Sequence, residues 1–261
     1  KSKVKRVVAR DNENINETWI SDRDRFSYQG VNNENRVLIP KIKIKGEWQD
    51  TSWDDALDFA INGIKKHAKE GSQFGTLVSK NATLEELHLL QKFTRGLGSD
   101  NLDYRLDASN PNNAKVLESN ISLTELETID HALIVNSYLR LEQPMINHRI
   151  RKATLNGASV STINAKAFDF NYRISHSVLT SPQNTVATLS GVLKALHDKS
   201  SKTLPDYLNS VTVDETHTDI ANVLLNAKNP VVVLGEHVNG NICSDQVAKL
   251  VSEIAKASDA K

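Results

Sequence analysis

The sequence predicts an α/β protein with doubly wound, mainly parallel sheets and a small β-rich segment at its N-terminal end. Short continuous apolar runs, such as residues 131–135 and 231–235, are typical of strands buried on both faces of a parallel sheet. Helical stripes, with apolar side chains at i, i+3, i+4 and i+7, alternate with these runs. The resulting β-α-β order favours parallel strands joined by right-handed crossovers.

The first segment, residues 1–50, is expected to be β-rich and irregular. Three valines within residues 4–8 predict a first strand. Ile42 and Ile44 alternate with lysines in residues 37–45, which is the period-2 pattern of a half-buried strand.

An α/β domain is expected over residues 51–180, where the apolar period changes to that of a helix. Ser52 with Asp55, and Thr83 with Glu86, are spaced to cap two helices. Each helix is expected to bury an apolar stripe: Trp53, Ala56, Leu57, Ala60, Ile61 and Ile64 in the first, and Leu84, Leu87, Leu90 and Phe93 in the second. The other expected elements are strands at 74–79, 101–106, 130–135 and 158–164, a loop at 107–120 and a helix at 143–156.

A second α/β region, truncated at its end, is expected over residues 181–261. Ser181–Pro182 and Ser244 are expected to begin helices, and a further helix is centred on residues 220–227. The apolar strand at 231–235 lies between the last two helices.

Composition excludes several classes of protein. The chain has 32 Lys and Arg against 32 Asp and Glu, so it lacks the basic excess of a broad nucleic-acid surface. No apolar run approaches the roughly 20 residues of a membrane-spanning helix. The chain also has no initiator methionine and opens in a strand-like segment, so we expect a fragment of a longer protein.

Cofactor and metal patterns are missing from the sequence. Cys243 is the only cysteine, so it can form neither an internal disulfide nor a four-cysteine cluster, and it indicates a reducing compartment. The turns after residues 79 and 135 contain no glycine, and Gly235 and Gly240 stand at the wrong spacing for a dinucleotide. The eight histidines show no i, i+4 pair of the kind that binds zinc.

The helix at 143–156 carries a group of basic side chains. For His148, Arg149 and Arg151, a role at the surface or in the core is the main interpretation. A basic ridge that meets a partner is the alternative.

Residues 16–30 read N-E-T-W-I-S-D-R-D-R-F-S-Y-Q-G. This stretch resembles the signature just past the iron–sulfur cysteines in the G subunit of NADH–quinone oxidoreductase, the large peripheral iron–sulfur subunit of respiratory complex I. In the related molybdopterin oxidoreductases, the region carries the last cysteine of a cluster motif, and Ser21 aligns with that cysteine. Because a hydroxyl does not supply the thiolate that holds such clusters, the resemblance implies that this cluster is missing.

Residues 129–165 are similar to the molybdopterin oxidoreductase pattern of strand, turn, arginine-bearing helix, Gly-Ala and strand. The departures lie at the two ends that touch the pterin in that family. The turn is Asn136-Ser137-Tyr138, with a bulky tyrosine, and Asn164-Ala165-Lys166 stands where the family has Asp-Pro-Arg. The degenerate cofactor positions are therefore Ser21, Asn136, Ser137, Tyr138 and Asn164. Residues 51–57 and 85–106 also resemble the complex I protein.

The resemblance implies a non-catalytic scaffold part of the complex I G subunit, without its N-terminal cluster-binding region. Residues 1–50 would be a remnant of the domain next to the iron–sulfur clusters. No catalytic residue, cofactor or metal is expected in this segment, and iron–sulfur clusters are expected in the missing N-terminal region. The implied partners are other peripheral-arm subunits, including the flavin-bearing subunit that oxidises NADH, on the cytoplasmic side of the bacterial inner membrane.

A contact with the missing cluster domain is expected at the charged and aromatic segment Asp22, Arg23, Asp24, Arg25, Phe26 and Tyr28. A self-contained surface turn with weak ion pairs is the alternative. For the whole chain, two other functions stay open. One is an active molybdopterin- or tungsten-dependent oxidoreductase, similar to formate dehydrogenase, whose metal ligand lies outside this segment. The other is a nucleotide-binding module such as the central domain of a thiamine-diphosphate enzyme.

Overall fold

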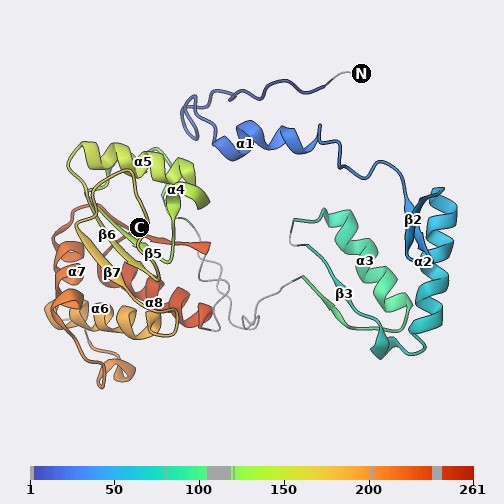
Figure 1. The fold of residues 1–261 in the computed structure, drawn as a ribbon. Helices are drawn as coiled ribbons and strands as arrows, with labels where there is room; N and C mark the ends of the chain where they lie inside the picture. Colours follow the sequence, from blue (N-terminus) through green and yellow to red (C-terminus); the bar gives the residue numbers. More distant parts are fainter. Residues whose placement is uncertain (1–2, 80, 105–118, 120, 201–202, 237–242) are drawn as a thin grey trace. The chain divides into compact units, whose positions relative to one another are not determined.

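The computed structural model describes residues 3–261 except 80, 105–118, 120, 201–202 and 237–242. The chain divides into two compact units (Figure 1). Unit 1 comprises Lys1–Val7 and Asp22–Leu106, and unit 2 comprises Val8–Ser21 and Asp107–Lys261. The loop expected at 107–120 lies almost entirely outside the described residues.

Unit 2 contains a four-stranded sheet in the order β7-β6-β5-β8. All neighbouring strands are parallel, as the β-α-β order predicted. Its strands are β5 (His131–Val135), β6 (Ser159–Asn164), β7 (His176–Leu179) and β8 (Pro230–Leu234). Strand β7 was not predicted, because its four residues are too few to show a clear period. This one sheet runs across residue 180, so the expected boundary between 51–180 and 181–261 does not separate two sheets.

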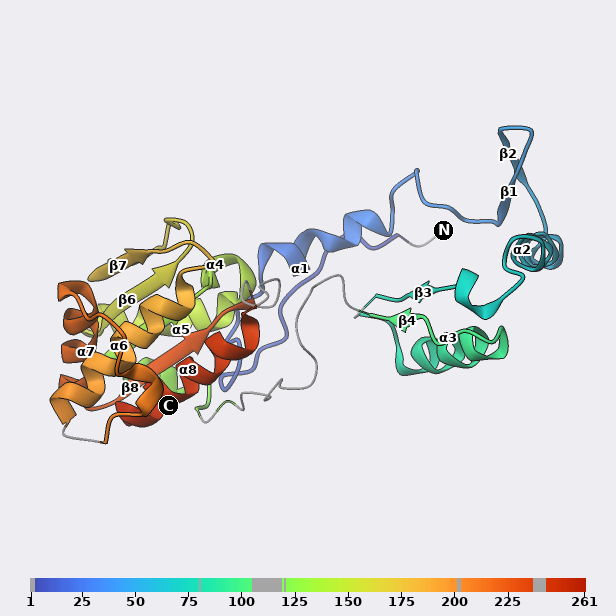
Figure 2. The same cartoon turned by 90° about the horizontal axis from the view of Figure 1, so that it is seen from below.

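Both faces of this sheet are covered by helices. Leu133 and Val135 point into a core formed with α6 (Thr185–Ser200), α7 (Glu215–Asn226) and α8 (Ser244–Ala257). Ala132 and Ile134 point the other way, into a core with α4 (Leu139–Glu142) and α5 (Pro144–Leu155). Figure 1 shows α4 and α5 on one side of the sheet. Helices α6 and α8 lie side by side on the opposite side, in Figure 1 and in Figure 2. The doubly wound α/β class is therefore confirmed.

Burial explains why unit 2 holds together. The four strand residues just named are fully buried, as are Leu189, Leu193 and Ile254 on the covering helices. Each buried Val, Leu or Ile side chain among them contributes roughly 1.5–3 kcal/mol through removal of apolar surface from water. Local signals set the helix ends: Asp214 caps α7 at the His217 N–H (2.9 Å), and Gly157 follows α5 with φ +100°. Two starts differ from prediction, since α6 begins at Thr185 after a turn and Cys243 is the N-cap of α8.

Unit 1 is built from smaller pieces. Its helices and strands are α1 (Asp22–Phe26), β1 (Lys41–Ile44), β2 (Glu47–Asp50), α2 (Trp53–His67), β3 (Thr76–Leu77), α3 (Leu84–Gly96) and β4 (Leu102–Asp103). Short 3-10 turns occur in both units, at Ser27–Gly30, Gly71–Gln73, Glu125–Thr128 and Asp206–Leu208. Strands β1 and β2 form an antiparallel hairpin, whereas β3 and β4 pair in parallel. Both predicted helix caps are present, but residues 3–11 form no strand.

The helices of unit 1 do not bury the stripes that the sequence predicted. Helix α2 has no buried residue, and Trp53 and Leu57 are 71% and 53% exposed. Leu84 on α3 is 78% exposed, and the only buried side chains among the described residues of unit 1 are Thr94 and Ser99. An apolar stripe marks one face of a helix, but burial also needs a second layer, which these two-stranded sheets are too small to provide. A groove of about 640 Å³ lies between α3 and the segment that follows β3, lined by Val78, Leu89, Leu90 and Phe93 among others.

Within the described residues, no helix is long and apolar enough to cross a bilayer.

Candidate functional site at the carboxyl edge of the sheet

Four of the five degenerate family positions lie together at the carboxyl ends of β5 and β6. The backbone N–H of Ser137 donates to Asn164 Oδ1 at 2.8 Å, in a buried hydrogen bond. The N–H of Asn136 donates to the carbonyl of Ile163 at 2.9 Å. Asn136 has φ +49°, a left-handed conformation in which asparagine is several-fold enriched over other non-glycine residues. Ser21 lies on a different segment, in the chain that precedes α1.

The fourth position, Tyr138, is held against the loop that follows β6. Its ring stacks on Phe168 with centroids 4.7 Å apart and meets Phe170 edge-on. The Tyr138 hydroxyl donates to the carbonyl of Asp169 at 3.0 Å, and Arg140 pairs with the Asp169 carboxylate at 3.1 Å. The tyrosine therefore packs the edge of the sheet with the chain's own side chains.

Glu142 also belongs to this edge, although the sequence patterns did not single it out. Its Oε1 accepts the Tyr138 N–H at 2.6 Å, and its Oε2 accepts the Ser137 hydroxyl at 3.0 Å and the Glu236 N–H at 3.2 Å. The Glu142 carboxylate accepts the N–H of Tyr138, the N-cap of α4, as in a capping box, but the spacing is four residues and not three. The local sequence pattern therefore marked neither these bonds nor the bond from the loop after β8.

Gly235 brings the end of β8 close to the loop after β5. Its N–H donates to the carbonyl of Val135 at 2.8 Å. A Cβ at this position would lie 2.2 Å from both the Asn136 carbonyl oxygen and the Ser137 Cβ. The glycine is required for this close approach of backbone to backbone. Of the turn that follows β8, residues 237–242 lie outside the described part of the chain.

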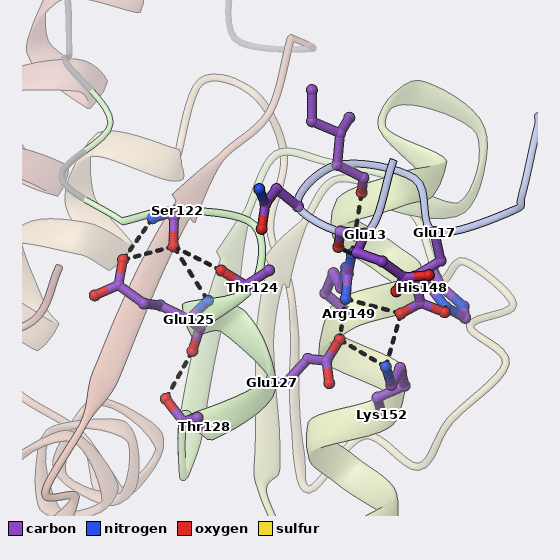
Figure 3. A network of polar contacts seen from close by, with 12 residues as sticks. Glu13, Glu17, Ser122, Thr124, Glu125, Glu127, Thr128, His148, Arg149 and Lys152 are labelled. Atoms are coloured by element: carbon purple, nitrogen blue, oxygen red, sulfur yellow. Dashed lines mark hydrogen bonds and ion pairs between the residues drawn. The ribbon is translucent and has the colours of Figure 1, made fainter. Parts of the chain in front are cut away.

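A second polar cluster joins the N-terminal loop of unit 2, residues 12–17, to helix α5 (Figure 3). Arg149 is 3% exposed, and its guanidinium donates to Glu17 at 2.8 Å, to Glu127, and to the carbonyl of Glu13 at 2.6 Å. Lys152 donates to both carboxylates at 2.7 Å. The basic side chains of α5 therefore differ: Arg149 is buried and pairs with carboxylates of this chain, whereas Arg151 is exposed.

The ionisation of this cluster follows from its contacts. The hydrogen bond from Lys152 lowers the pKa of Glu17, with a smaller contribution from His148. Burial acts to raise the pKa of Glu127, but the bonds from Lys152 and Arg149 outweigh it and lower that pKa. Glu17 also has φ +51°, a conformation that is uncommon for a glutamate and that the bonds to Arg149 and Lys152 help to hold.

The predicted contact segment, residues 22–28, forms α1 and the turn after it. Arg23 and Asp24 pair at 3.9 Å with both side chains largely exposed, and Phe26 is 50% exposed. Such an exposed pair contributes little to stability.

No group of three or more His, Cys, Asp or Glu side chains is placed to bind a metal in the part of the chain that the structure describes.

These features define a doubly wound α/β protein whose strand-end loops are bonded to one another. Residues 36–260 match the molybdopterin oxidoreductase family, and the chain belongs to that family. Residues 1–29 match the NADH-ubiquinone oxidoreductase NDSU1/NuoG-like 4Fe-4S domain.

Similar proteins support the match to the NADH-ubiquinone oxidoreductase family of iron–sulfur subunits. The chain is 33% identical to NADH dehydrogenase [ubiquinone] iron-sulfur protein 1 of Solanum tuberosum, over 97% of this chain and 31% of that protein. It is 33% identical to the NADH-quinone oxidoreductase G subunit of Rickettsia felis, over 66% of this chain and 25% of that protein. Among solved structures, acetylene hydratase from Pelobacter acetylenicus matches 95% of this chain and 39% of that chain, with a TM-score of 0.66 and 12% identity, which shows the fold alone. The chain thus spans about a third or less of the two relatives named here.

The cofactors that these matches imply do not fit the residues present. Residues 1–29 contain no cysteine, so they offer no thiolate to an iron–sulfur cluster. At the edge of the sheet, the Tyr138 and Glu236 N–H groups and the Ser137 hydroxyl already donate to Glu142. A pterin pyrophosphate would need donors of this kind.

Proposed function

We propose that this chain is a non-catalytic scaffold segment of the electron-transfer G subunit of NADH:quinone oxidoreductase, respiratory complex I. It supports the domains that carry iron–sulfur clusters and docks neighbouring subunits while electrons pass from NADH to quinone. The proposal that this segment is non-catalytic rests on one observation. Glu142 and Tyr138 occupy the edge of the sheet that faces the pterin in other members of the family.

The relatives support a place in a larger assembly, because the proteins from Solanum tuberosum and Rickettsia felis are named as parts of NADH dehydrogenases. We assign the chain to the peripheral arm, on the cytoplasmic side of the bacterial inner membrane. Its partners there are the other peripheral subunits, including the flavin-bearing subunit that oxidises NADH. The exposed apolar side chains of α2 and α3 are consistent with a docking role, since large exposed apolar patches mark interaction surfaces.

Metal analysis of the full-length protein separates this role from the second candidate, a molybdopterin- or tungsten-dependent oxidoreductase. We expect iron from clusters elsewhere in the protein, and neither molybdenum nor tungsten, by inductively coupled plasma mass spectrometry. One molybdenum or tungsten per chain would overturn the scaffold role. Calorimetry with an adenine nucleotide tests the third candidate, and we expect no saturable binding.

The contact proposed for residues 22–28 gives a second test. Residues 1–29 match a 4Fe-4S domain, which supports a contact between this segment and the cluster-bearing region. Replacing Arg23 and Arg25 together by alanine is expected to reduce the amount of the other peripheral subunits that co-purifies with the full-length protein. Arg173→Ala with Lys228→Ala is the control, because it removes two exposed positive charges outside α1, α2 and α3. Equal co-purification of both double variants would remove this contact from the proposal.

A further inference from the structure

The four-stranded sheet has a topological switch point. From β5 the chain steps to β6 and then to β7 on one side, and it later adds β8 on the other side of β5. In open parallel sheets, ligands bind outside the carboxyl ends of the strands at the point where the strand order reverses. In this protein that point lies between the loop after β5 and the loop after β8.

Glu142 occupies this point with both carboxylate oxygens. The Ser137 hydroxyl and the Tyr138 N–H approach from the loop after β5, and the Glu236 N–H approaches from the loop after β8. Glu142 is 94 residues away from Glu236 in sequence, so this hydrogen bond links the loop after β8 to the segment that follows β5. Gly235 allows this close approach, because a side chain there would collide with Asn136 and Ser137.

The donors around Glu142 are those that a phosphate group takes. Backbone N–H groups and a hydroxyl that converge on a pair of oxygens are a recurrent anion-binding arrangement. A carboxylate attached to the same chain is always present at high local concentration, and its charge repels a second anion from the same donors. Phosphate in solution is therefore at a disadvantage against Glu142.

We propose that the strand-end loops at this switch point form an anion site occupied by Glu142 of the same chain, and that inorganic phosphate or pyrophosphate is the class of ligand these donors bind once the carboxylate is removed. This inference rests on the same Glu142 contacts as the inert role and goes beyond that role by assigning a ligand class to the donors. The two proposals fail differently: absence of a pyrophosphate response in the 261-residue chain overturns the ligand class alone, whereas molybdenum or tungsten in the full-length protein overturns the scaffold role.

The test is rescue of a carboxylate deletion by phosphate. Glu142→Ala is expected to lower Tm by about 3–6 °C, since three donors lose their acceptor. Sodium pyrophosphate is expected to restore at least half of this loss, in comparison with sodium chloride at equal ionic strength, because a ligand that binds only the folded state stabilises it. The wild-type Tm is expected to be the same in the two salts.

Glu215→Ala is the matched control. It removes one exposed carboxylate from the first turn of α7, and we expect neither a comparable loss of Tm nor a response to pyrophosphate. The inference is overturned if pyrophosphate stabilises the wild type and Glu142→Ala equally, or if Glu142→Ala responds only to ionic strength.

Two measurements keep the test decisive if Glu142→Ala does not fold. Glu142→Gln removes the charge and keeps one acceptor oxygen, so its pyrophosphate response is expected to be present but smaller. In the wild type, the amide hydrogens of Tyr138 and Glu236 are expected to exchange slowly with solvent, because both donate to Glu142. Fast exchange at both amides would show that the Glu142 carboxylate does not hold these donors.

Discussion

Replacing Arg149 by alanine is expected to lower the free energy of unfolding by about 3–5 kcal/mol, because it breaks a buried ion-pair network from one side. The Arg149 side chain is 4% exposed and contacts two carboxylates and the carbonyls of Glu13 and Ile15. Without it, Glu17 and Glu127 keep only Lys152 and the weaker contact from His148. Urea unfolding followed by far-UV circular dichroism measures the loss.

Arg151→Ala supplies the comparison for this prediction. It removes the same side chain from the same helix at an exposed position, and it is expected to change stability by less than about 0.5 kcal/mol. Adding Glu17→Gln and Glu127→Gln to Arg149→Ala is expected to recover part of the loss, because part of the cost comes from two partly buried carboxylates that share a single lysine. Equal effects of Arg149→Ala and Arg151→Ala would mean that the network does not hold residues 12–17 in solution.

Acidification is expected to destabilise the protein through His131 before the carboxylates titrate. His131 is 1% exposed at the start of β5, with Nδ1 2.8 Å from the Ser159 hydroxyl. Burial, with a smaller contribution from His176, lowers the pKa of His131 from 6.5 to about 4. The unfolded chain therefore binds more protons than the folded chain between these two values, so stability is lost as pH falls through this window. The expected loss from this group is about 2 kcal/mol between pH 7 and pH 5, and about 3 kcal/mol by pH 4.

His131→Asn tests the assignment of this pH dependence. Asparagine keeps a polar atom near the Ser159 hydroxyl but does not titrate, so the slope of stability against pH between 5 and 6.5 is expected to become flatter. Glu17 and Glu127, whose pKa values are lowered, contribute stability that is present above about pH 4.5 and is lost only at lower pH. Their effect is expected to survive in His131→Asn. A slope between pH 5 and 6.5 that is unchanged by the substitution would exclude His131 as its source.

Local patterns in the sequence were enough to find most elements and the family. The apolar run at 131–135 became a fully buried parallel strand, and Thr83 with Glu86 formed the expected capping box. The run at 231–235 also became a parallel strand, but β8 lies at the edge of the sheet and is only partly buried, so its expected full burial was wrong. Periodicity reports the local conformation and the apolar face of a segment. It does not report whether a second layer covers that face, which is why the expected burial of the stripes on α2 and α3 was wrong.

The candidate site was likewise only partly predictable from the sequence. The departures at Asn136, Ser137, Tyr138 and Asn164 lie together at the carboxyl edge of the sheet, because parallel strands end at the same edge. Glu142 remained unnoticed, since an acid near a helix start has an ordinary local explanation.

The sequence by itself determined the α/β class, the order of the main elements and the membership in the molybdopterin oxidoreductase family. Only the tertiary structure decided that Glu142 meets the N–H of Glu236, and that Arg149 meets Glu17, which is 132 residues away in the chain. The physical reason is that hydrogen bonds and ion pairs depend on distances of about 3 Å in space. Those distances are set by how the helices pack on the sheet, and residue spacing along the chain contains no record of them.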